Sequence, residues 1–253
     1  MCRCKGCNTP TPPKASDPSA HLEFCSAICE EKSCGHPHKP GLINALSVSD
    51  PTKFAELKKQ FLDKWLHSSY TPPSTIEIYS VDMSCSKRAF EAYRQSIVAK
   101  RPHLAKPKGI AGPGNSRRRF HGTNLECDIG KSTMDTCSKA DCSVCLILKS
   151  GGLTIKKFGA QTGWGRFGNG IYTTSTSSKA NDYSRGAHKA VFMLEVIVGD
   201  AVKLTANDQT LTKAPNGMDA VIGEVAPGGV LNYDELVVYS DEACLIKYLV
   251  RYS

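Results

Sequence analysis

The chain has 253 residues, of which 40% are hydrophobic and 22% charged, so a mainly disordered protein is excluded and one sizeable core, with or without a small satellite, is predicted. The net charge of +8 favours an anionic partner such as nucleic acid, phosphate or an acidic surface, although many proteins carry such a charge without using it. No apolar run approaches the roughly 20 residues that cross a bilayer, and the first residues, MCRCKGCNTPTPP, lack the apolar stretch of a secretion signal. We therefore expect no membrane partner and an intracellular protein, nuclear or cytoplasmic.

Residues 1–40 are rich in Cys, Pro, Ser and His and poor in large aliphatic side chains, so this segment cannot build a core of its own. Thiols stay reduced inside cells, where clustered cysteines indicate zinc more than disulfides. Two thiolate pairs joined by a loop suit a closed tetrahedral site, which is structural because it leaves no open position for catalysis. The predicted ligands are Cys4, Cys7, Cys25 and Cys29, with Cys2, Cys34, His36 and His38 as further candidates. The alternative is a tail with reactive thiols.

Two helices and a strand are predicted next. In SDPTKFAELKKQFLDKWLHSS, Ser49 or Asp50 can cap a helix, and Pro51 fits its first turn. Apolar residues follow at helical spacing, at Phe54, Leu57, Phe61 and Trp65. After the break at TPP (71–73), IEIYSV (76–81) alternates like a strand, and SKRAFEAYRQSIVAK (86–100) has helical periodicity.

A second group of cysteines follows the Gly- and Pro-rich loop KGIAGPGNS and the run RRRFHGT. Its final Cys-x2-Cys pair has a familiar zinc-knuckle spacing, whereas the other gaps are irregular. We predict a second structural zinc site that pins a long polar excursion, with the ligands Cys127, Cys137, Cys142 and Cys145. The isolated Cys85 and Cys244 are expected to be core residues.

Short strand-like runs separated by Gly, Pro and Asn make up the rest of the chain: GIYTT, AVFMLEVIVG, ELVVY and LIKYLVRY. Helices first and then a mainly antiparallel β region predict an α+β fold. The predicted organisation is a zinc-bound module over residues 1–40 and a second domain over 41–253 that contains the cysteine-rich insertion at about 125–150.

Five polar or aromatic residues lie in four short segments of this region: His121 in RRFHGT, Tyr172 in GRFGNGIYTT, Lys179 and Tyr183 in SSKANDYS, and Glu235 in NYDELVVY. Each has an ordinary explanation taken singly. The histidine is then a structural residue, Tyr172 strand core, Tyr183 a helix cap, Lys179 a solvated lysine and Glu235 an edge-strand charge beside an exposed Asp234. Their occurrence as an ordered set favours a functional site.

RFHGT, FGNGIYTTSTSSKANDY and LNYDELVVYSDEACLIKYLVRY resemble the three signature blocks of the poly(ADP-ribose) polymerase catalytic domain, in the same order. The resemblance reaches back to IEIYSVDMSCSKRAFEAYR, covers roughly residues 50–253, and is greatest to fungal members that pair this domain with cysteine-rich segments. It implies the ADP-ribosyltransferase fold, with a split, mainly antiparallel sheet and flanking helices, and NAD as substrate.

The resemblance also implies roles for individual residues. His121 binds a ribose hydroxyl on the adenosine side of NAD, and the Gly122 backbone bonds the nicotinamide carboxamide. Tyr172 and Tyr183 sandwich the nicotinamide ring, and Glu235 holds the 2′-hydroxyl of the nicotinamide ribose and helps to activate the acceptor. Lys179 lies close to the glutamate, and the implied NAD-binding set also contains Thr123 and Ser178.

The chemistry of these residue types agrees with that assignment. A cationic pyridinium gains on the order of 1–2 kcal/mol from each aromatic face when desolvated, and a carboxylate stabilises an oxocarbenium-like centre as its charge develops. The sequence departs from the family at Ala180, where a serine commonly bonds the carboxamide. Losing that bond costs about 0.5–1.5 kcal/mol unless Ser177 or Ser178 compensates. The stretch between Tyr183 and Glu235 also looks short for the family. This indicates a reduced loop on the acceptor side, which bears on the choice of acceptor.

The sequence therefore predicts an NAD-dependent ADP-ribosyltransferase that cleaves the nicotinamide glycosidic bond and passes ADP-ribose to a protein or a nucleic acid. The alternatives are an NAD glycohydrolase and a degenerate module that binds NAD or ADP-ribose or acts as a scaffold. A basic run could contact nucleic acid or the NAD pyrophosphate, or could be a solvated loop; it comprises Arg117–Arg119, Lys100, Arg101, Lys106 and Lys108.

Overall fold

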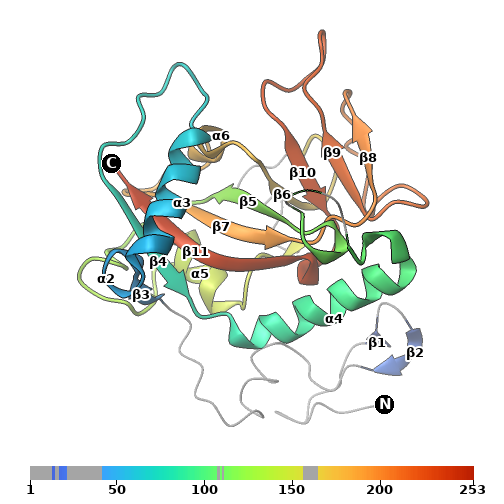
Figure 1. Cartoon of the computed structure of the whole chain (residues 1–253), viewed down its shortest axis with the longest axis horizontal. Helices are drawn as coiled ribbons and strands as arrows, with labels where there is room; N and C mark the ends of the chain where they lie inside the picture. The colour runs from blue at the N-terminus through green and yellow to red at the C-terminus, as the bar shows by residue number, and fades with distance from the viewer. Residues whose placement is uncertain (1–12, 15–16, 22–41, 107–108, 110, 156–164) are drawn as a thin grey trace.

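The computed structural model describes residues 13–14, 17–21, 42–106, 109, 111–155 and 165–253 (Figure 1). Near the N-terminus, β1 (Pro13–Lys14) and β2 (Asp17–His21) form an antiparallel pair. The cysteines of the predicted N-terminal zinc site lie outside the described residues: Cys4, Cys7, Cys25 and Cys29. That site and the boundary of a module at residue 40 therefore stay predictions.

The larger of two main sheets has five antiparallel strands in the order β3-β4-β11-β7-β5. Its long central strands, β7 and β11, run through the middle of the molecule (Figure 1). The strands span Leu42–Ala45 (β3), Ile76–Val81 (β4), Arg117–Gly122 (β5), Lys189–Val196 (β7) and Cys244–Tyr252 (β11).

The second sheet has four strands in the order β6-β10-β9-β8, of which only the β8–β9 pair is parallel. Its strands are Ile171–Thr173 (β6), Ala201–Leu204 (β8), Ala220–Gly223 (β9) and Glu235–Val238 (β10). A single bridge joins the two sheets, because Phe120 of β5 and Thr174 after β6 exchange backbone hydrogen bonds of 2.8 and 3.0 Å. The ends of β5 and β6 therefore meet at a seam between the sheets.

Helices cover both faces of the five-stranded sheet. The helices are α2 (Leu46–Ser49), α3 (Pro51–Asp63), α4 (Ser84–Lys100), α5 (Ser143–Lys149) and α6 (Ser177–Asn181), with 3-10 turns at Pro102–Leu104, Pro113–Asn115 and Asp241–Ala243. Among the described residues, none of these helices is both long and apolar enough to cross a bilayer.

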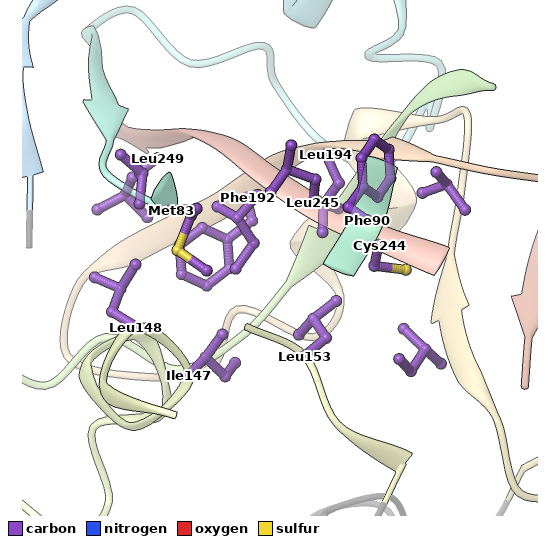
Figure 2. Close-up of a cluster of buried hydrophobic side chains, with 14 of the residues drawn as sticks. Met83, Phe90, Ile147, Leu148, Leu153, Phe192, Leu194, Cys244, Leu245 and Leu249 are labelled. Atoms are coloured by element: carbon purple, nitrogen blue, oxygen red, sulfur yellow. The ribbon is translucent and has the colours of Figure 1, made fainter. Parts of the chain in front are cut away.

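Strand β7 shows how the core is divided, because its side chains alternate between two buried clusters. Phe192 and Leu194 face the larger cluster with Phe90 of α4 and Leu148 of α5. Figure 2 shows this cluster, in which residues of β7, β11, α4 and α5 converge. Val191 and Met193 face the opposite way, toward Leu57 and Phe61 of α3. Each such buried side chain contributes about 1.5–3 kcal/mol, so α3 and α5 are fixed on opposite faces of one strand.

The α+β class with mainly antiparallel sheets is confirmed, as are both predicted helices and the strand at 76–81. The predicted order of helices first and strands later holds only in part: α3 and α4 precede most of the strands, but β3 and β4 come before α4, and the short helices α5 and α6 lie among the later strands. Strand β5 forms where the sequence reads RRRFHG. Cys244 is a buried core residue, as expected. The side chain of Cys85 lies outside what the structure describes.

The structure distinguishes the two candidate caps of α3. The Asp50 side chain accepts a 2.9 Å hydrogen bond from the Lys53 backbone nitrogen, whereas Ser49 Oγ donates to the Ala45 carbonyl. Asp50→Ala should lower the free energy of unfolding by about 0.5–2 kcal/mol in urea denaturation, because it leaves a donor of the first turn without its partner. Ser49→Ala, the control, should change it by less than about 0.5 kcal/mol. Equal losses would contradict the assignment of the cap.

Candidate active site

A cavity of about 370 Å³ opens at the seam between the two sheets. Its walls come from segments far apart in the sequence: the end of β5, β6, α5, α6 and the start of β10. The predicted site residues that line it are His121, Gly122, Thr123, Tyr172, Lys179, Tyr183 and Glu235. Folding thus brings together, around one cavity, every residue of the predicted NAD-binding and catalytic set except Ser178.

A buried ion pair lies in this cavity. Lys179 Nζ is 2.8 Å from Glu235 Oε1, and the two residues are only 8% and 6% exposed. The ammonium also donates to the backbone carbonyls of Tyr233 (2.9 Å) and Asp234 (3.3 Å). Burial lowers the pKa of Lys179 and the negative charge of Glu235 opposes that shift. The lysine is therefore a fixed part of the site and not a solvated surface residue.

The second carboxylate oxygen of Glu235 has a different environment. Glu235 Oε2 is buried and finds no hydrogen-bond partner within the described part of the chain. Leaving a buried acceptor unpaired costs about 1–3 kcal/mol, more for a charged group, so such atoms need an explanation. Because Glu235 lines the cavity, a ligand hydroxyl placed there would supply the missing donor.

His121 is held in one tautomer by the neighbouring strand. Its Nδ1 lies 2.9 Å from the carbonyl oxygen of Tyr172, and a carbonyl can only accept, so Nδ1 carries the proton. Burial lowers the pKa of the imidazole. In the neutral ring Nε2 is then an acceptor, which suits a ligand hydroxyl.

Two tyrosines contribute aromatic walls to the cavity. Tyr172 lies on β6, and its hydroxyl accepts from the Phe167 backbone nitrogen and donates to the Gly168 carbonyl, each at 2.8 Å. Tyr183 follows α6 and is 44% exposed, which is unusual for so large an apolar ring. Burial is the main cause that raises the pKa of both phenols above the ordinary value of 10. Both residues line the cavity, where a ligand can contact them.

Gly122 is required by the packing of the fold itself. A Cβ at this position would lie 1.7 Å from the carbonyl oxygen of Ala180, in α6. The glycine thus lets α6 approach β5, and this approach places Ala180, Lys179 and Tyr183 at the cavity. The close approach of α6 is therefore sufficient reason for a glycine at this position.

Ser178 is placed outside the cavity, contrary to the prediction. It is fully buried, and its hydroxyl accepts from the backbone nitrogens of Leu66 (3.0 Å) and His67 (2.9 Å). Ser177 is equally buried and donates to the Phe61 carbonyl at 2.6 Å. Neither hydroxyl therefore compensates for the serine that Ala180 replaces. Instead, both tie α6 to the end of α3.

Asp234 is not the exposed charge that the sequence suggested. It is partly buried, and its carboxylate accepts from Thr174 Oγ1 (3.2 Å) and from Ser175 Oγ (2.6 Å) and the Ser175 backbone nitrogen (3.1 Å). These bonds connect the start of β10 to the turn between β6 and α6. Asp234 therefore fixes the position of its neighbour Glu235.

Three of the seven residues in the predicted basic run form ion pairs within the chain, and Arg117 and Arg119 donate hydrogen bonds to Asn115 Oδ1 and to the Arg118 carbonyl. Lys100 Nζ and Arg101 Nε lie 2.7 and 2.9 Å from Asp219, and Arg118 lies 3.0 Å from Glu56. These contacts favour a structural role over nucleic-acid binding for these residues. The remaining lysines of that prediction are Lys106, which is exposed, and Lys108, which lies outside the described residues.

The second cysteine cluster has the geometry of a metal site. The sulfurs of Cys127, Cys137, Cys142 and Cys145 all lie within 4.8 Å of one another. Cys127 is 3.6 Å from Cys145 and 3.7 Å from Cys142. A tetrahedral ion with bonds of about 2.3 Å separates neighbouring sulfurs by about 3.8 Å, whereas a disulfide needs about 2.05 Å. This cluster could hold a zinc ion, as predicted.

The cavity also includes residues that the sequence reading did not single out. Arg166 and Arg185 are its cations besides Lys179, and they are suited to the phosphates of a nucleotide. Ser143, Leu146 and Ile147 of α5 form another wall. No local pattern marks these residues, because they reach the cavity through tertiary contacts.

The lowered pKa of His121 predicts a dependence of stability on pH. The unfolded ring has the ordinary value of 6.5, so just below it the unfolded chain binds more protons than the folded one. The stabilisation by neutral His121 is complete above pH 6.5 and is lost as the pH falls toward its folded pKa, by up to about 1.4 kcal/mol per pH unit. His121→Gln should flatten this part of the pH profile of unfolding in urea, whereas His103→Gln, at an exposed site, should retain it. Parallel profiles for His121→Gln and the parent would contradict the assignment.

Comparison with known proteins agrees with this geometry. The model of the poly(ADP-ribose) polymerase catalytic domain matches residues 142–228, which include Tyr172, Lys179 and Tyr183. Human protein mono-ADP-ribosyltransferase PARP4 is 28% identical over 242 residues, covering 89% of this chain but 12% of the human protein. Its mouse counterpart is 27% identical over 151 residues, covering 55% of this chain and 7% of the mouse protein. Both relatives are mammalian, so the likeness to fungal members stays a prediction. Over these residues the chain is thus similar to the poly(ADP-ribose) polymerase catalytic domain, and along most of its length it is similar to a small part of PARP4.

Proposed function

We propose that this chain is an NAD-dependent ADP-ribosyltransferase whose active site is the cavity at the seam of the two sheets. One observation carries the proposal: Glu235 is buried beside Lys179 in that cavity, and its Oε2 atom finds no donor among the described residues. A ribose hydroxyl of NAD would provide that donor. The names of the two relatives, each a mono-ADP-ribosyltransferase, support the same reaction.

The other lining residues fit the parts of NAD. Tyr172 and Tyr183 offer aromatic faces to the positively charged nicotinamide ring, and this contact is stronger before the ring leaves as a neutral base. His121 Nε2 can accept a hydrogen bond from a hydroxyl of the adenosine ribose, because Nδ1 carries the proton and donates it in a hydrogen bond to the Tyr172 carbonyl. Thr123 and the backbone of Gly122 lie beside them, where they can contact the carboxamide.

In the proposed reaction, the bond between the nicotinamide nitrogen and the ribose C1″ breaks, and its electron pair leaves with nicotinamide. Positive charge develops on the ribose, which becomes oxocarbenium-like. Glu235 accepts a hydrogen bond from the adjacent 2″-hydroxyl, and this bond strengthens as the charge grows. Lys179 holds the other oxygen of the glutamate and so orients Oε2 toward the sugar. An acceptor nucleophile then bonds to C1″ and loses its proton.

We propose that single ADP-ribose units are transferred, because both relatives are named for that activity. The acceptor would be a protein or a nucleic acid, and water as acceptor would make the site an NAD glycohydrolase. Mass spectrometry after incubation with NAD, alone and with protein or DNA, distinguishes these products. Bound NAD with no release of nicotinamide would instead indicate a binding module.

The carboxylate is tested by Glu235→Gln, which keeps the size of the side chain. Release of nicotinamide should fall by about 10²–10³-fold, as for removal of a group aimed at transition-state charge. Affinity for carba-NAD, in which a methylene replaces the ribose ring oxygen on the nicotinamide side, should change little in calorimetry. Glu224→Gln is the matched control, because Glu224 is exposed and pairs with Lys203 on the second sheet. Normal turnover by Glu235→Gln would refute the assignment.

The departure at Ala180 predicts a gain of affinity. Ala180 lines the cavity, and the neighbouring serines are bonded elsewhere, so Ala180→Ser should restore one hydrogen bond to the carboxamide. A bond worth about 0.5–1.5 kcal/mol corresponds to roughly 2- to 13-fold tighter binding of carba-NAD in calorimetry. Ala201→Ser, on β8 away from the cavity, should leave affinity unchanged. Unchanged or weaker binding by Ala180→Ser would show that residue 180 does not face the carboxamide.

A further inference from the structure

The four-cysteine cluster and the cavity share one short helix. Cys142 directly precedes α5, and Cys145 lies within it. The same helix contributes Ser143, Leu146 and Ile147 to the wall of the cavity. Two of the four sulfur ligands therefore belong to the element that shapes the space for the ligand.

The cluster also holds the adjoining part of the cavity wall, in the segment that follows β5. Thr123 and Asn124 line the cavity, and the Asn124 carbonyl accepts from the Val144 backbone nitrogen at 3.0 Å. Two residues later, the backbone nitrogen of Glu126 donates to Cys142 Sγ at 3.4 Å. Cys127, the next residue, is itself a member of the cluster. The sulfurs thus join the end of the His121–Gly122 strand to α5.

The beginning of α5 depends on tertiary contacts: the Val144–Asn124 bond, the burial of Val144, and the sulfur cluster. The helix has seven residues and no side-chain cap at its N-terminus, and so short a helix does not form in isolation. The loop at residues 131–141 lies between Cys127 and Cys142, includes Cys137, and contains no buried residue. Val144 and Leu148 do anchor one face of the helix in the core. The core therefore holds the helix to the sheet, while the cluster sets where it begins and how it lies along the cavity.

We infer that a zinc ion bound by Cys127, Cys137, Cys142 and Cys145 fixes the α5 wall of the ligand cavity, so that ligand affinity depends on occupancy of the metal site. The identity of the ligand rests on the proposed function. The ion acts as a positioning element: four thiolates complete its coordination, so no position remains for substrate.

The test compares the full chain before and after removal of metal with a chelator, and after zinc is added back. Metal content is measured by elemental analysis, carba-NAD affinity by calorimetry, and amide hydrogen exchange by mass spectrometry. Removal should weaken carba-NAD binding at least about tenfold and speed exchange in 123–127 and 143–149. Exchange in β4, β7 and β11 should stay as it was, and zinc should reverse both effects.

Cys137→Ser removes the cluster member that lies in the polar loop and should lose one equivalent of zinc with the same loss of affinity. The control is Cys4→Ser combined with Cys7→Ser, which changes cysteines of the N-terminal segment and should leave carba-NAD affinity as in the parent. The inference is overturned by iron in place of zinc, by unchanged affinity after metal loss, or by lost protection throughout β7 and β11, which would make the metal a global stabiliser. If metal removal speeds exchange at 143–149 but the metal-loaded chain does not bind carba-NAD, the proposed function fails and the positioning role stands.

Discussion

The buried contact between Lys179 and Glu235 is the interaction on which the site depends. Two charges with so little exposure are costly to bury, and removing one partner would leave the other uncompensated. The buried ammonium of Lys179 is stabilised by hydrogen bonds to two backbone carbonyls and by the carboxylate of Glu235. Only one oxygen of Glu235 is left over, and it lies at the cavity. This arrangement favours a role in chemistry, because a pair formed for stability alone would satisfy both oxygens.

The ion pair forms only if two elements, α6 and β10, are both correctly placed. Lys179 comes from α6, which reaches β5 only because Gly122 has no side chain, and which is tied to the end of α3 by Ser177 and Ser178. Glu235 begins β10, where Asp234 bonds the turn before α6. Ser177, Ser178 and Asp234 do not line the cavity, whereas Gly122 does. Most of the residues that position the ion pair are therefore distinct from those that line the cavity.

Sequence reasoning found the elements whose periodicity is strong and local. The stripe from Phe54 to Trp65 predicted α3, and the alternation in IEIYSV predicted β4 with its observed bounds. The ordered set of histidine, tyrosine and glutamate, together with the resemblance to the family's signature blocks, also predicted most of the residues that line the candidate site. Sequence reasoning missed α6, whose five residues form a helix through tertiary hydrogen bonds and not through propensity. It misjudged Asp234 and Ser178 for the same reason, since their partners are distant in sequence.

Under the proposed function, Ala180 and Glu235 affect different quantities, because the alanine affects the affinity for NAD and the glutamate affects the rate of its cleavage. Under the proposed function, a hydrogen bond to the carboxamide helps the substrate and the transition state to similar extents, so its loss mainly lowers affinity. The bond to Glu235 strengthens as charge develops and therefore acts on the rate. A chain that keeps Glu235 and lacks the serine can hold NAD weakly and still cleave it. Ala180 also belongs to the buried core cluster that contains Phe61 and Phe120, which joins α6 to the sheet. Under the proposed function, alanine at this position therefore lowers affinity for the ligand while it contributes to packing, and Glu235 keeps its role in the reaction.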